Sequence, residues 1–154
     1  MSKDKGIVID AKIYRNTSQL IKIFLKNNGF VLGYAKGIYK MKKFDFDGPF
    51  KTFFEYEVEI RGDPVHNDIV LLTSSKCISA IDYIMFDRLL FFKKIQDSIE
   101  FIFMPGYKDV ATYNFFRLSI HHFSKLQKPQ FLHYAYFVCN ILRLLGLLNY
   151  ATLN

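Results

Sequence analysis

The hydrophobic pattern of this chain changes its period once, near residues 73–76, and this change constrains the fold more than any other feature. Before it, apolar and β-branched residues occur in short runs separated by turn residues, which is typical of β-strands. After it, apolar residues recur at every third or fourth position, which is typical of amphipathic helices. A chain of 154 residues has room for one domain with two such parts, or for two small domains in contact.

The first part contains five strand-like runs. The strongest turn between them is Lys26-Asn27-Asn28-Gly29, because Asn-Gly readily adopts positive φ. In the fourth run, apolar residues alternate with Glu55, Glu57 and Glu59, so we expect these carboxylates to form an acidic stripe on one face. Five short strands with such turns predict a small closed barrel such as the OB fold, and an SH3-like barrel would show much the same pattern. The expected strands are 6–14, 19–25, 30–35, 52–60 and 69–73.

The second part predicts three helices, over 79–103, 109–126 and 129–145. Pro129 suits a first helical turn and Gly146 suits a helix end. We therefore predict an α+β protein in which a five-stranded OB-fold β-barrel at residues 1–78 binds DNA and a helical domain at residues 79–154 binds a protein partner. The polar start predicts no signal peptide, and the lack of a long uncharged apolar run predicts no membrane span.

Positive charge is concentrated at the start of the chain. The first 43 positions hold ten basic and two acidic residues, whereas the next 25 hold two basic and seven acidic ones. With a net charge of +7 overall, the chain favours anionic partners: nucleic acid, an acidic protein tail or an anionic membrane surface.

The basic segment ends at residues 34–43, where lysines alternate with aromatic and apolar residues around Gly37. Single-stranded nucleic acid needs this combination, because cations neutralise phosphates and flat rings stack on bases. A solvated hairpin with lysines on its outer face would give the same composition, and Tyr34 could equally belong to the core. Base-edge readers are not evident, so binding is expected to be largely independent of sequence. The candidate DNA-binding residues are Arg15, Tyr34, Lys36, Tyr39, Lys40, Lys42 and Lys43.

The helical part carries a second group of cations, Lys125, Lys128 and Arg143, near apolar helix faces. Together they could receive an acidic-hydrophobic peptide, or they could be scattered surface charges.

The sequence offers little for catalysis or metal binding. It contains no phosphate-binding glycine loop, zinc-protease motif or nucleophile elbow. Cys77 and Cys139 lack partners at ligand spacing, and we expect both to be buried thiols. Asp45 and Asp47 could seat a divalent ion as in a nuclease, but they flank a Gly-Pro turn of ordinary composition. We therefore expect a protein that is not an enzyme, with no cofactor and no metal.

An ordered set of residues also matches the spacing of a known family. In the first part these are Gly6-Ile7-Val8, Tyr14, Thr17-Ser18, Leu20, Phe24, Gly29, Ala35-Lys36-Gly37 and Gly48-Pro49-Phe50. Near the end, residues 137–146 are similar to the family pattern F-x-x-x-L-L-x-x-L-G. The chain thereby resembles the RecO family of bacterial recombination-repair mediators.

The resemblance implies an OB-fold domain followed by a helical domain, placed in the bacterial cytoplasm in association with the nucleoid. It also implies binding of single-stranded and double-stranded DNA, annealing of complementary strands and assistance in loading RecA. The implied protein partners are RecR and the acidic C-terminal tail of single-stranded DNA-binding protein. The chain departs from the family at Asn16, Leu25 and Tyr39. The four-cysteine zinc module that many members carry is not found in residues 1–154, so we expect either a shortened relative or a part of a longer chain. A scaffold that binds acidic partners without contacting DNA is the alternative.

Overall fold

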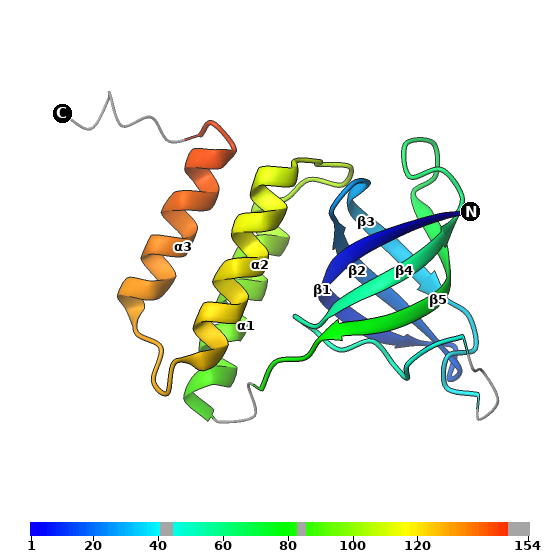
Figure 1. The fold of residues 1–154 in the computed structure, drawn as a ribbon, viewed down its shortest axis with the longest axis horizontal. Coiled ribbons are helices and arrows are strands. Elements are labelled where there is room, and N and C mark those ends of the chain that lie inside the picture. The colour runs from blue at the N-terminus through cyan, green and yellow to red at the C-terminus, as the bar shows by residue number, and fades with distance from the viewer. Residues whose placement is uncertain (41–44, 83–85, 148–154) are drawn as a thin grey trace.

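The computed structural model describes residues 1–40, 45–82 and 86–147 (Figure 1). Five strands come first and three helices follow, as the change of hydrophobic period predicts. The strands are β1 (Ser2–Tyr14), β2 (Ser18–Leu25), β3 (Gly29–Ala35), β4 (Glu55–Arg61) and β5 (Ile69–Ser79). The helices are α1 (Phe86–Ile102), α2 (Val110–Lys125) and α3 (Phe131–Leu144).

The five strands close into a barrel in the order β1-β2-β3-β5-β4. Strand β3 runs parallel to β5, and the other neighbouring pairs are antiparallel. The predicted OB-fold barrel followed by helices is confirmed. The last strand is longer than expected because Ser74, Ser75 and Lys76, which look like a turn in sequence, pair with β4. The first helix consequently starts later than the expected residue 79.

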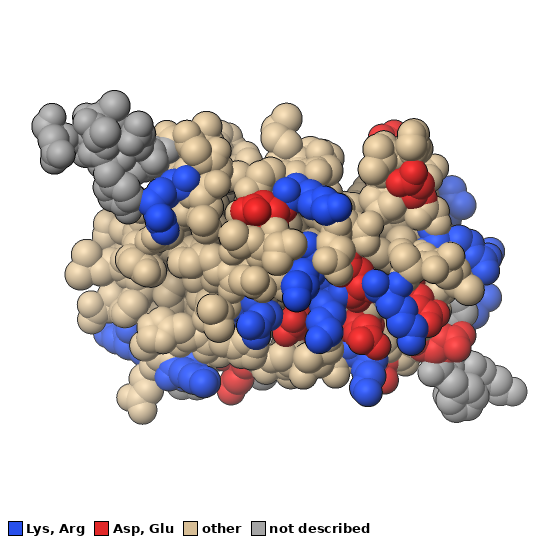
Figure 2. Space-filling model, turned by 45° about the horizontal axis from the view of Figure 1, so that its top comes forward, with Lys and Arg blue, Asp and Glu red and all other residues tan. Residues whose placement is uncertain are grey.

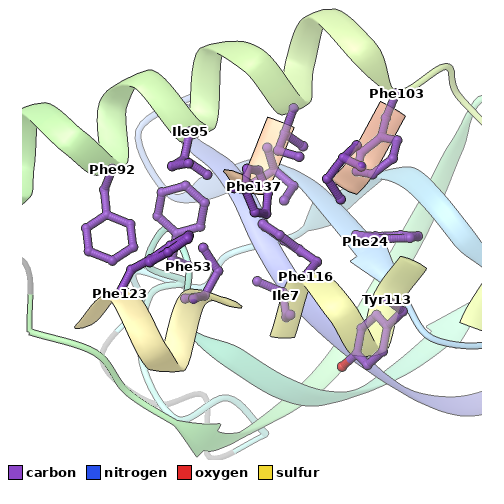
Figure 3. Packing of buried hydrophobic residues seen from close by; sticks show 14 of the residues in the cluster. Ile7, Phe24, Phe53, Phe92, Ile95, Phe103, Tyr113, Phe116, Phe123 and Phe137 are labelled. Atoms are coloured by element: carbon purple, nitrogen blue, oxygen red, sulfur yellow. The ribbon is translucent and has the colours of Figure 1, made fainter. Parts of the chain in front are cut away.

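Two hydrophobic cores hold the molecule together. The first fills the barrel with inward-facing side chains such as Ile21, Val58 and Leu72. The second lies between the outside of the barrel and the helices, and Figure 3 shows its aromatic rings meeting there from both sides. Phe24 of β2, for example, packs against Phe103 and Tyr113, with ring centroids 5.0 and 5.7 Å apart. This second core contains most of the phenylalanines that give the sequence its unusual aromatic content.

The helix ends follow local sequence chemistry. Asp109 precedes α2, and its carboxylate accepts a hydrogen bond from the backbone N–H of Thr112 at 3.1 Å. After α3, Gly146 adopts a φ of 74°, and the N–H of Leu147 donates to the carbonyl of Leu142. The predicted helix end at Gly146 is therefore confirmed.

The expected acidic stripe on β4 is wrong at one position. Glu57 and Glu59 are half-buried on the outer face, but Glu55 is only 6% exposed. Its carboxyl accepts a hydrogen bond from the hydroxyl of Tyr113 on α2 at 2.9 Å. Alternation along β4 correctly places Glu55 outside the barrel, but it cannot reveal that a helix covers this part of the barrel.

The helices cover one side of the barrel and leave the rest of its outer surface open. Figure 1 shows α3 farthest from the barrel, and the β1–β2 turn at the end of the barrel remote from the helices. The chain that follows β3 lies beside this turn. The β1–β2 turn and residues 36–40 are thus placed where the helices do not hide them.

Candidate nucleic-acid interface

The β1–β2 turn presents Arg15 to solvent. Arg15 and Asn16 both have positive φ, at 50° and 62°, within the three-residue turn, residues 15–17, that joins Tyr14 to its cross-strand partner Ser18. Arginine adopts this conformation at some cost, whereas asparagine tolerates it well. The exposed Arg15 guanidinium lies 5.1 Å from the ring centroid of Tyr14, within range of a cation–π contact.

Hydrogen bonds join this turn to the chain that leaves β3. The Ser18 hydroxyl oxygen accepts from the backbone N–H of Gly37 at 2.9 Å, and the N–H of Tyr39 donates to the carbonyl of Thr17 at 3.1 Å. Gly37 has a φ of 64°, which favours glycine at this bend. Two segments separated by about 20 residues in sequence are therefore fixed side by side.

Three of the predicted cations lie on the two segments that are joined at this junction. Arg15, Lys36 and Lys40 are all exposed, and we call them the basic cluster. Lys42 and Lys43 lie outside the described residues, so their predicted role stays a prediction. Since the bonds above connect the segments that carry the cluster, one polynucleotide backbone could contact all three cations.

Tyrosine rings lie next to the basic cluster. Tyr34 is half-buried on the outer face of β3, and its hydroxyl lies 3.2 Å from the hydroxyl oxygen of Ser18. It meets Tyr14 edge-on, with centroids 5.9 Å apart, so it does not belong to the barrel interior. Tyr39 is 38% exposed. Tyr14 was not predicted as a binding residue, although its position directly before Arg15, opposite Ser18, could have indicated it.

An open apolar surface continues from the tyrosines across the outside of three strands. Because Ile21, Val31 and Val70 point into the barrel, their strand neighbours point outward. One cross-strand row joins Leu20, Tyr34 and Leu71, and the next joins Lys22, Leu32 and Ile69. We call these six residues the open face. The OB folds that bind oligonucleotides use this part of the barrel, the outer surface around strands 2 and 3 between the β1–β2 and β4–β5 loops.

The other side of the barrel is charge-balanced. Lys3 pairs across strands with Glu59, with a nitrogen-to-oxygen distance of 3.5 Å, and Lys5 and Lys76 stand opposite Glu57. Figure 2 shows this mixture of basic and acidic side chains over the barrel, beside helices with little charge. Mutual neutralisation makes this side a poor site for a polyanion.

The cations of the helical part do not converge on one place. Lys125 ends α2 and Lys128 lies in the connection to α3, so both stand near the start of α3. Arg143 lies in the last turn of α3, about 18 Å away along the helix axis, and donates to the side chain of Asn140. The start of α3 also exposes Phe131 and Leu132, at 72% and 74%. Lys125 and Lys128 therefore lie on one partly apolar surface, and Arg143 lies outside it.

The other polar groups considered from sequence have structural partners. Asp47 accepts a hydrogen bond from the backbone of Cys77 at 2.9 Å, and the carbonyl of Asp45 accepts from Ser75. Among the described residues, no three His, Cys, Asp or Glu side chains are placed to share a metal ion. Cys77 is half-buried, and Cys139 is exposed, so the expectation of two buried thiols is wrong for Cys139. None of the described helices is both long and apolar enough to cross a lipid bilayer.

Fold and surface together define an OB-fold protein with a basic, aromatic-lined face and helices packed against its barrel. Comparison with protein families assigns it further. Residues 1–81, just over half of the chain, match the family described as Recombination protein O N terminal. The chain belongs to the RecO family, and its role lies in DNA recombination and repair. No curated protein matched the chain in the search.

Proposed function

We propose that this chain is a DNA-binding recombination mediator without enzymatic activity, which binds single-stranded and double-stranded DNA in the bacterial cytoplasm, at the nucleoid. The observation that carries the proposal is the junction of the β1–β2 turn with the chain after β3. It gathers Arg15, Lys36 and Lys40 beside three tyrosines, next to the open face and away from the helices. The family supports the same function.

Binding by this surface would be largely electrostatic. The basic cluster neutralises phosphates, and Tyr14, Tyr34 and Tyr39 offer rings to bases, each worth about 1–3 kcal/mol where a base stacks. Annealing follows from the same charges, because two strands held on one basic protein repel each other less. Strands brought together in this way can pair without any covalent bond being made or broken, so this function needs no catalytic group.

The first experiment is a titration of a labelled oligothymidylate of about 20 nucleotides with two charge-reversed proteins. Lys36→Glu with Lys40→Glu should weaken binding strongly, because two phosphate contacts become repulsive. The matched control is Lys93→Glu with Lys94→Glu, which reverses two exposed lysines on α1. Equal affinity of the two double variants would show that the basic cluster does not hold DNA. A wild-type protein that leaves the oligonucleotide unbound would instead favour the scaffold alternative.

The start of α3 is the surface we propose for the acidic C-terminal tail of single-stranded DNA-binding protein. Lys125 and Lys128 supply positive charge, and the exposed Phe131 and Leu132 supply apolar contacts, which together suit an acidic-hydrophobic peptide. Lys125→Glu with Lys128→Glu should abolish binding of such a peptide, whereas Arg143→Glu, at the other end of the helix, should leave it unchanged. The reverse result would place the site elsewhere. RecR binding and assistance to RecA loading are proposed from the family alone.

A further inference from the structure

A cleft lies where the barrel meets the connection between α1 and α2. Three segments line it: the start of β3 with the turn before it, the β4–β5 loop at residues 62–68, and the α1–α2 loop at residues 103–109. Its volume is about 700 Å³. Figure 1 shows the two loops at the top of the molecule, on either side of the β2–β3 turn. The cleft therefore belongs to neither domain alone.

Both walls of the cleft are held in place. The α1–α2 loop is fixed to β3 by two backbone hydrogen bonds of 2.8 Å, from Phe30 to the carbonyl of Tyr107 and from Gly106 to the carbonyl of Phe30. The β4–β5 loop folds around Asp63, whose side chain accepts from the N–H of Val65 at 2.9 Å and contacts the ring of His66. That contact with His66 is the main reason why the pKa of Asp63 lies below its usual value. A ligand would find the site already shaped.

The lining suits a ligand that is anionic at one side and flat and apolar at the other. Of the described residues that line the cleft, two are lysines, Lys22 and Lys108, and one is a carboxylate, Asp68. Lys108 is exposed, whereas Lys22 lies 3.5 Å from the carboxylate of Glu100 and is partly neutralised. Apolar lining comes from Leu32 and neighbouring side chains of β3, together with the proline rings of both loops.

The cleft is continuous with the open face. Lys22 and Leu32 belong to both, since their cross-strand row borders the cleft. The row of Leu20 and Tyr34 lies two residues further along the strands, at a spacing of about 7 Å. Because nucleotides of an extended strand are spaced by a similar distance, a strand lying on Tyr34 would bring its next nucleotide to the cleft.

Given the proposed function, we propose that the cleft holds one unstacked nucleotide of a single strand. The neighbouring nucleotides of that strand lie on the open face. Lys108 contacts the phosphate of the nucleotide in the cleft, and its base enters between the two loops over Leu32. The volume falls within the range of small-ligand sites, which is about 300–1,000 Å³. A base in a duplex is paired and stacked and would have to be flipped out first, at a cost of a few kcal/mol. The cleft therefore makes this chain prefer single strands to duplex.

Two measurements on the full chain test this inference. Lys108→Glu should weaken binding of oligothymidylate about tenfold more than the control Lys94→Glu, and should reduce binding of a hairpin duplex by a smaller factor. Second, oligothymidylate carrying 5-iodo-2′-deoxyuridine should cross-link on irradiation to peptides containing residues 62–68 or 105–108, and the crosslinks should disappear with an iodinated duplex.

The possible failures are distinguishable. If oligothymidylate binds but the crosslinks map only to residues outside the two loops, the cleft is not part of the path. If Lys108→Glu and Lys94→Glu behave alike, or if duplex binding falls as much as single-strand binding, the inference is overturned while the basic cluster stands. If the wild-type chain binds no oligonucleotide, both the inference and the proposed function fail. A melting temperature equal to that of the wild type establishes that each variant keeps the fold.

Discussion

The hydrogen bond between Tyr113 and Glu55 is a buried polar link between α2 and the barrel, within the core that joins them. The two groups are 1% and 6% exposed, and the hydroxyl-to-carboxyl distance is 2.9 Å. Tyr113→Phe removes the hydroxyl and leaves the Glu55 carboxyl without that donor. Leaving a buried acceptor unsatisfied costs about 1–3 kcal/mol, and more if the acceptor is charged. For a chain of this size each kcal/mol lowers the melting temperature by about 2–4 °C.

The same pair makes a prediction about pH. Burial, and then the nearby Glu55 carboxyl, raise the pKa of Tyr113 well above its ordinary value of 10.0. At high pH the unfolded chain therefore loses this proton while the folded chain keeps it. The stabilisation is complete below about pH 10 and falls above it, by at most about 1.4 kcal/mol per pH unit. Tyr113→Phe should remove this part of the decline.

Chemical denaturation of wild type and Tyr113→Phe at neutral pH and above pH 10 provides the assay. Tyr107→Phe is the control, since the Tyr107 hydroxyl bonds to the neutral Thr112 hydroxyl at 3.0 Å and is only half-buried. We expect its free energy of unfolding to fall by about 1 kcal/mol. If Tyr113→Phe is no more destabilising than Tyr107→Phe and shows the same alkaline decline as wild type, the reasoning about this pair is refuted.

Two further substitutions test how the β2–β3 turn is held. A Cβ at Gly29 would lie 2.4 Å from the Tyr107 carbonyl oxygen, so Gly29→Ala should melt several degrees below Gly48→Ala, where φ is also positive but no atom lies within 4 Å; equal melting temperatures would contradict this. Asp4 is 3% exposed and accepts hydrogen bonds from the turn, so Asp4→Ala should cost about 2–4 kcal/mol in urea unfolding, against less than about 1 for Asp10→Ala. Similar losses for both would show that the turn does not need this carboxylate.

The strand pattern of the sequence predicts the barrel because the signals of each strand, alternation and turn chemistry, depend on only a few neighbouring residues. Pairing between strands is not local, and this is why Ser74 to Lys76 were missed as part of β5. The same limit explains why the burial of Glu55 is not predicted, because its neighbours in sequence do not indicate that a helix covers it. Alternation also cannot decide whether Tyr34 faces inward or outward. In the structure Ala35 points into the barrel, and a Cβ at Gly33 would meet Leu72 there, so Tyr34 between them faces outward.

The interface was partly predictable for a related reason. Lys36, Tyr39 and Lys40 are close in sequence and were recognised by composition. Arg15 is predicted from its place on a neighbouring turn, and the hydrogen bonds that Ser18 and Thr17 accept hold that turn beside residues 37–39. Apart from Tyr34, the open face is not predicted from sequence, because its members come from three strands, two from each. The cleft went unnoticed because one of its walls belongs to the helical domain.

The salt dependence of oligothymidylate binding tests the central claim most directly. If Arg15, Lys36, Lys40, Lys42 and Lys43 each neutralise a phosphate, the logarithm of the affinity should fall against the logarithm of salt with a slope of about −3.5, or steeper if Lys108 also contributes. Lys36→Ala with Lys40→Ala should reduce the slope by about 1.4, because two contacts are lost. A wild-type slope near zero, or a slope that the double variant leaves unchanged, would contradict a phosphate-binding surface on this barrel.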